Sequence, residues 1–68
     1  NLCKLVGQNI RKYRLEKKLS QEGLAFESGL HRTYISSLER GKRNATILVL
    51  GQIADALKIK PSLLLEKD

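Results

Sequence analysis

The sequence predicts an all-α domain, a compact bundle of five short helices that forms a single unit over residues 1–68. Apolar residues recur along the chain at the three- and four-residue spacing of amphipathic helices. Serine, threonine, proline and glycine stand where such helices would begin and end. No stretch shows the strict alternation of apolar and polar residues that marks a half-buried strand, so a purely helical fold is favoured.

The first two helices are predicted over residues 4–17 and 21–28. Ser20 supplies an N-cap oxygen for the second of them. Gly29 follows that helix directly and is suited to a left-handed helix stop. The inward-facing residues of these two helices are expected to include Val6, Ile10, Leu24 and Ala25.

Three further helices are predicted in the second half of the chain. His31 can cap a helix over residues 32–39, which Gly41 would end, and Thr46 caps the helix after it. Pro61 fits the first position of a last short helix, where a missing N–H costs nothing. The first of these helices turns Ile35 and Leu38 inward, and the last carries Leu64 and Leu65. The helix between them has an apolar stripe made of Ile47, Leu50, Ile53, Ala54 and Leu57.

The pairing of Ala25 with Gly29 predicts a helix-turn-helix unit over residues 21–40. Two short helices joined by a tight turn cross steeply, which requires a small side chain where they approach. Ala25 meets that need, and Gly29, four residues later, tolerates a positive φ in the turn. An ordinary helical hairpin would share the apolar residues but not this pair, so the helix-turn-helix interpretation is favoured.

The charge balance favours an anionic partner. Lysine and arginine number 13 against 7 acidic residues, a net charge of +6, which suits nucleic acid, an anionic membrane or an acidic protein. The basic residues gather in residues 11–18 and 32–43. Such runs are also compatible with an ordinary solvated surface. However, Glu39 is the only acidic residue between His31 and Asn44, which favours binding to an anion.

Several other classes of function are disfavoured. The sequence has no nucleophile–base pair, carboxylate pair or phosphate loop, so we expect no enzyme. With one histidine, His31, and one distant cysteine, Cys3, it offers no metal-ligand spacing. We therefore expect no metal, cofactor or small-molecule ligand. The single cysteine favours a reducing compartment, the cytoplasm, and no apolar run approaches the roughly 20 residues of a membrane span.

The run LSQEGLAFESGLHRTYISSLERGKRNATILVLGQIADALKI resembles the phage-repressor-like helix-turn-helix family. That family includes lambda-type repressors, plasmid and antitoxin regulators, and the controller proteins of restriction–modification systems. The segment GLHRTYISSLERGKRN is similar to the controllers in particular. The resemblance spans about residues 6–65 and implies a sequence-specific transcriptional regulator of double-stranded DNA, with the helix 32–39 in the major groove. The chain departs from the family pattern at Gly23, His31 and Ala45.

The resemblance assigns DNA contacts to the helix 32–39 and its flanks. Base readout is expected from Arg32, Thr33, Ser36 and Ser37. Phosphate contacts, which position the domain without reading sequence, are expected from Gln21, His31, Tyr34, Lys42, Arg43 and Asn44. Arg32 can contact guanine through two hydrogen bonds. Tyr34 could instead pack on the bundle, and His31 could serve as a helix cap.

The resemblance also implies an ion pair, and a departure from the family pattern indicates a partner surface. Arg14 and Glu39 fall where the family pairs the first helix with the end of the third, so a semi-buried structural pair is expected. Leu48, Val49 and Leu63 are apolar where the family more often has polar residues, which favours a homodimer interface over scattered surface leucines. A homodimer would place two recognition helices about 34 Å apart on a palindromic operator.

Two alternatives stay open. The sequence begins at Asn1 and contains no methionine, which is compatible with a DNA-binding appendage of a larger protein, such as a methyltransferase or a full-length repressor. The same fold can also serve as a protein-interaction module, because a fold does not dictate its use. The scarcity of acidic residues in the helix 32–39 disfavours the second alternative.

Overall fold

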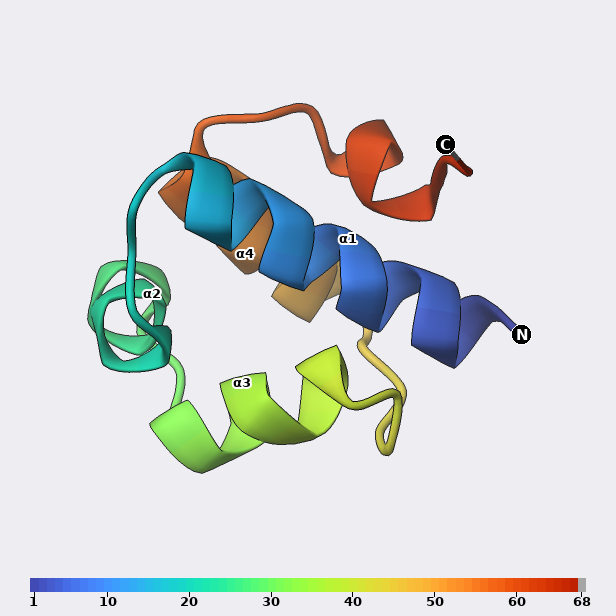
Figure 1. Cartoon of the computed structure of the whole chain (residues 1–68), viewed down its shortest axis with the longest axis horizontal. Helices are drawn as coiled ribbons and strands as arrows, with labels where there is room; N and C mark the ends of the chain where they lie inside the picture. The colour runs from blue at the N-terminus through green and yellow to red at the C-terminus, as the bar shows by residue number, and fades with distance from the viewer. Residues whose placement is uncertain (68) are drawn as a thin grey trace.

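A computed structural model describes residues 1–67, which form α-helices and one short 3₁₀-helix and contain no strand. In chain order the elements are α1 (Leu2–Glu16), α2 (Gln21–Ser28), α3 (Arg32–Glu39), α4 (Ile47–Leu57) and η1 (Pro61–Leu65). The long α1 crosses the bundle, with α3 and η1 on opposite sides of it in Figure 1. The predicted all-helical class is therefore confirmed.

The prediction of five α-helices is wrong for the last element. Residues Pro61–Leu65 form a 3₁₀-helix, in which the Leu63 N–H donates to the Lys60 carbonyl three residues back, at 3.0 Å. The segment has only five residues and no side-chain cap, which is too short for a stable α-helical run. Pro61 does occupy the start of the element, as its fixed φ predicts.

The first helix begins two residues earlier than predicted. Asn1 is its N-cap, and the Asn1 side chain accepts a hydrogen bond from the Lys4 N–H at 3.0 Å. This bond satisfies one of the amides that the first helical turn leaves free, so the helix starts at Leu2 rather than at residue 4.

The predicted caps and stops around the helix-turn-helix unit are mostly confirmed. Ser20 accepts from the Gly23 N–H at 2.9 Å, and Thr46 accepts from the Val49 N–H at 3.1 Å. Gly29 has φ 74°, the left-handed conformation that the turn was expected to need. Figure 1 shows α2 nearly end-on while α3 runs across the view, so the two helices cross steeply.

One expected cap is absent. His31 occupies the N-cap position of α3, but its side chain makes no capping hydrogen bond. The imidazole is exposed instead, so the role of helix cap that the sequence suggested for this side chain is wrong.

The core lies where α1, α2, α3, α4 and η1 meet. Its buried apolar residues are Val6, Ile10, Leu24, Ala25, Ile35, Leu38, Ile53, Ala54, Leu57 and Leu64. One residue of the apolar stripe predicted for α4 is exposed, because Ile47 is 87% accessible. The burial of α4 decreases toward its N-terminus, from fully buried Ile53 through half-buried Leu50 to Ile47, so its first turn extends beyond the packed region.

Among the described residues, none of the helices combines the length and the apolar character that crossing a membrane requires.

Candidate nucleic-acid interface

The inner face of α3 is anchored tightly to α1. Ile35 is completely buried and Leu38 is 1% accessible. At Gly7 the backbone of α1 approaches the end of α3 so closely that a Cβ would overlap the Leu38 carbonyl oxygen and lie 2.9 Å from that of Glu39. Only glycine fits there without a shift of the backbone, so the end of α3 packs against α1 in one fixed position.

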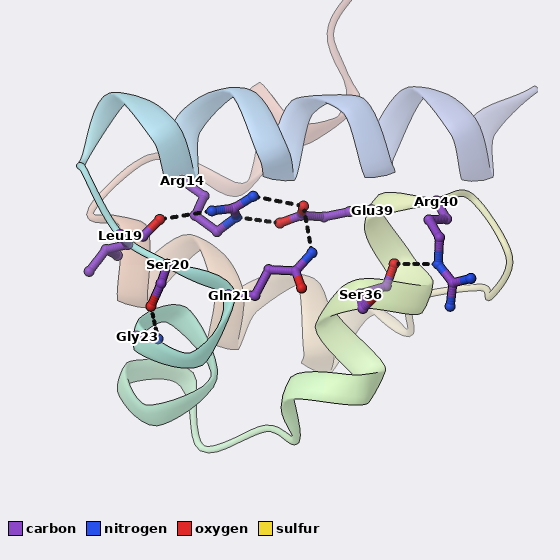
Figure 2. Close-up of polar contacts among 8 residues, drawn as sticks. All are labelled: Arg14, Leu19, Ser20, Gln21, Gly23, Ser36, Glu39 and Arg40. Carbon is purple, nitrogen blue, oxygen red and sulfur yellow. Dashed lines mark hydrogen bonds and ion pairs between the residues drawn. The ribbon is translucent and has the colours of Figure 1, made fainter.

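Arg14 and Glu39 form an ion pair between α1 and the end of α3 (Figure 2). Arg14 Nε donates to Glu39 Oε2 at 2.6 Å, and Arg14 Nη2 donates to Glu39 Oε1 at 3.1 Å. The two side chains are only 7% and 4% accessible. The third donor, Arg14 Nη1, binds the Leu19 carbonyl at 2.8 Å. This arginine therefore links α1, the following loop and α3, and it is not a surface cation.

Gln21 joins the same carboxylate from the start of α2. Its Nε2 donates to Glu39 Oε1 at 3.2 Å, so in the unbound protein this amide faces inward, as Figure 2 shows. The network thus fixes α2 relative to α3 through side chains as well as through the turn between them. The phosphate contact predicted for Gln21 stays a prediction.

Burial of this pair changes the electrostatics of the outer surface. Glu39 is the only acidic residue in residues 31–44, and its charge is neutralised inside by Arg14. The cations of the same stretch are all exposed, and they are Arg32, Arg40, Lys42 and Arg43. The outward side of α3 and its flanks therefore presents positive charge without a compensating carboxylate.

The predicted base-reading residues lie together on the outward side of α3. Arg32 and Thr33 are exposed at its first turn, and Ser36 and Ser37 follow one turn later, half-buried. Short serine side chains there let the helix backbone approach another surface closely. Such an early-turn arrangement is the one that groove-binding helices use to reach base edges.

Sequence reasoning missed Arg40, which extends this face at its C-terminal end. Arg40 follows Ser36 by four residues, and its Nε donates to the Ser36 carbonyl at 3.3 Å, as Figure 2 shows. The four-residue spacing of Arg32, Ser36 and Arg40 places all three on one helix face and could have revealed it.

Four of the predicted contacts gather at the start of α3. His31, Thr33, Tyr34 and Arg43 line one shallow hollow of about 350 Å³ together with Gly29 and Leu30. The Arg43 guanidinium lies 5.0 Å from the centre of the Tyr34 ring, a cation–π contact. The Tyr34 hydroxyl donates to the Asn44 carbonyl at 3.5 Å. Tyr34 thus packs against the core, and its ring holds Arg43, one of the residues expected to contact phosphate.

The residues expected at a partner surface do not share one environment. Leu48 is 80% accessible, whereas Val49 and Leu63 are half-buried and Val49 packs against the core. Other apolar residues that the prediction did not include are more exposed, namely Leu2 (67%), Ile47 (87%) and Leu65 (48%). Leu2 and Leu65 line one hollow with Leu50, a helical neighbour of Ile47 and Leu48 in α4. Residues 1–67 contain no group of side chains suited to hold a metal ion.

Two short helices that cross at a glycine turn, the second with a buried apolar side and a cationic, polar outer side, define a helix-turn-helix domain. The chain belongs to the helix-turn-helix family, because the family profile matches residues 10–64.

Named relatives and solved structures agree with this family assignment. The chain is 49% identical to the control protein C.BamHI of Bacillus amyloliquefaciens over 67 residues, covering 97% of this chain and 83% of that protein. It is similar to the crystal structure of the restriction–modification controller C.AhdI from Aeromonas hydrophila, with a TM-score of 0.89, 45% identity, and 91% and 94% of the two chains covered. It is also similar to the controller C.Esp1396I, solved as a tetramer with its 35 base-pair operator, with a TM-score of 0.85, 44% identity, and 93% and 83% coverage.

Proposed function

We propose that this protein is a sequence-specific, double-stranded DNA-binding transcriptional regulator of the restriction–modification controller type. The observation that carries the proposal is the outward side of α3, where Arg32 and Thr33 are exposed while Glu39 is hidden against Arg14. The solved complex of the similar controller C.Esp1396I with its operator supports the same function here. Because its named relatives are control proteins and regulators, we expect no catalytic activity.

Within this function, α3 enters the major groove. Base edges are read by Arg32, Thr33, Ser36 and Ser37, and Arg40 reaches DNA at the end of the same face. Phosphate groups are bound on either side by Gln21, His31, Tyr34, Lys42, Arg43 and Asn44. For Gln21, binding requires that the amide nitrogen use its second hydrogen or release Glu39.

The test is a selection of bound sequences from a pool of random DNA duplexes. The proposal predicts enrichment of one consensus, and a homodimer predicts that the consensus is palindromic, with half-sites one helical turn apart. Recovery of duplexes without any shared sequence would overturn sequence-specific binding. A single unrepeated half-site would preserve specificity but overturn the dimer on a palindromic operator.

We also propose a homodimer that uses Leu48, Val49 and Leu63 together with the exposed Leu2, Ile47 and Leu65. Exposed apolar side chains, of which Leu2 and Leu65 line one hollow, favour burial against a second copy. Leu48→Glu is expected to convert a dimer to a monomer in sedimentation equilibrium. Phe26→Glu is the matched control, because Phe26 is 84% accessible but lies on α2, and it should leave the mass unchanged. A wild-type monomer at high concentration would reject the dimer.

A further inference from the structure

The loop that follows α3, residues 41–44, is held by the first turn of α1. We propose that Cys3 is a positioning residue for this loop and that it orients the Asn44 amide toward DNA phosphate. The inference rests on the proposed DNA-binding function and adds to it a role for a residue outside the helix-turn-helix unit.

Asn44 is held at two atoms. The Cys3 thiol donates to Asn44 Oδ1, a hydrogen bond between residues 41 positions apart in the sequence. The Tyr34 hydroxyl donates to the Asn44 carbonyl from α3. Because the thiol faces the acceptor end of the amide, the Nδ2 end, which carries two donors, is directed away from Cys3. A donor pair in that position suits the oxygens of a phosphate.

The other end of the loop rests directly on α1. Gly41 has φ 70°, and a Cβ there would lie 2.9 Å from Lys4 Cγ and 3.1 Å from Lys4 Cα. The loop backbone is therefore in contact with the helix turn that carries Cys3. Lys42 and Arg43 lie between these two held ends, and the Arg43 guanidinium is further held on the Tyr34 ring.

These contacts reduce the conformational entropy that the loop loses when the protein binds DNA. A loop that is already ordered loses less conformational freedom when its side chains engage DNA, so affinity rises without any new contact. The supporting turn of α1 precedes residues 10–64, the part of the chain that the family profile matches. The support of the loop therefore comes from a part of α1 that lies outside the residues that the family profile matches.

The test compares three variants with the wild-type protein. Cys3→Val removes the donor at nearly constant volume, whereas Cys3→Ser keeps a hydroxyl donor. Gln8→Ala is the control, an exposed position on the same helix. Affinity is measured for the selected duplex and for a random duplex, and amide hydrogen exchange is measured at residues 42–45. Cys3→Val is expected to weaken binding to both duplexes by the same factor, roughly two- to tenfold, and to speed exchange in the loop. Cys3→Ser should restore both properties.

Each outcome decides the proposal. Wild-type affinity and wild-type loop exchange in Cys3→Val would overturn it, and so would a loss in Cys3→Ser as large as in Cys3→Val, because packing rather than the donor would then be responsible. A loss as large in Gln8→Ala would also overturn it, because any change in α1 would then weaken binding. If the wild-type protein binds no duplex, the proposed function fails, while loop exchange still reports whether Cys3 holds the loop.

Discussion

Arginine has opposite roles on the two sides of α3, the inner side that packs on α1 and the outer side that is exposed. On the inner face, Arg14 and Glu39 neutralise each other at 7% and 4% accessibility, and Gly7 brings two backbones together. On the outer face Arg32 is exposed, as is Arg43 in the loop that follows α3, and Glu39, the one acidic residue in residues 31–44, is buried. The inner face fixes where α3 lies, and the outer face determines what it can contact.

The difference shows that burial, not membership of a basic run, decides what an arginine does. Arg14 belongs to the cationic stretch of residues 11–18, yet it is buried and donates to the Glu39 carboxylate and to the Leu19 carbonyl. A substitution on the inner face should therefore lower stability first, and one on the outer face should lower DNA affinity while leaving stability nearly unchanged. The following predictions test that division, beginning with the largest expected effect.

Arg14→Ala should destabilise the fold by about 3–5 kcal/mol, because it leaves the Glu39 carboxylate buried with its cation removed and the neutral Gln21 amide still bound to it. The free energy of unfolding is measured by urea denaturation. Lys17→Ala is the matched control, an exposed neighbour in the same basic run, and should change stability by less than about 0.5 kcal/mol. Equal denaturation midpoints for the two variants would contradict a structural role for the ion pair.

Gly7→Ala should destabilise by about 1–3 kcal/mol, because the added methyl would meet the Leu38 and Glu39 carbonyl groups and push α3 away from α1. Gly51→Ala in α4 is the control, since nothing lies within 4 Å of a Cβ there. Alanine in that helix interior should raise stability, by up to about 1 kcal/mol. Thermal unfolding distinguishes the two variants, and a melting temperature for Gly7→Ala at or above wild type would show that α3 is not seated against this backbone.

Structural roles that depend on residues near one another in the sequence were predictable. Ser20, Gly29 and Thr46 act within a few residues of themselves, so their cap and turn roles could be recognised from the sequence. The Arg14–Glu39 pair spans 25 residues and was expected only because the resemblance places these two positions together. Its geometry, with a third donor on the Leu19 carbonyl, is contributed by the fold alone.

The remainder depends on tertiary geometry that the sequence does not display. Helical periodicity places Ile47 on the apolar stripe of α4, but it cannot show that this turn extends past the neighbouring helices. The contact between Cys3 and Asn44 joins residues 41 positions apart and has no sequence pattern. The base-reading assignments remain predictions, since position on an exposed helix face does not identify a base.

Arg32→Ala should reveal the reading function of the outer face. Arg32 is exposed in the first turn of α3, where side chains reach base edges. Its loss should cost about 1–3 kcal/mol of binding free energy on the selected duplex and much less on random DNA. Fluorescence anisotropy with both duplexes measures this difference. The unfolding free energy should stay within about 0.5 kcal/mol of wild type, since the side chain is exposed.

Arg43→Ala should have the smallest and least selective effect. Its guanidinium lies beyond α3, on the Tyr34 ring, where it is placed to contact the DNA backbone rather than a base. Arg32 and Arg43 carry the same charge, so a purely electrostatic surface predicts equal losses for the two variants on every duplex. The division between reading and positioning predicts instead that Arg43→Ala weakens selected and random duplexes by similar factors and lowers the salt dependence of log K by about one unit. Binding at several salt concentrations decides between the two accounts. If Arg32→Ala also lowers both affinities equally, Arg32 contacts phosphate, and base reading must reside in Thr33, Ser36 and Ser37.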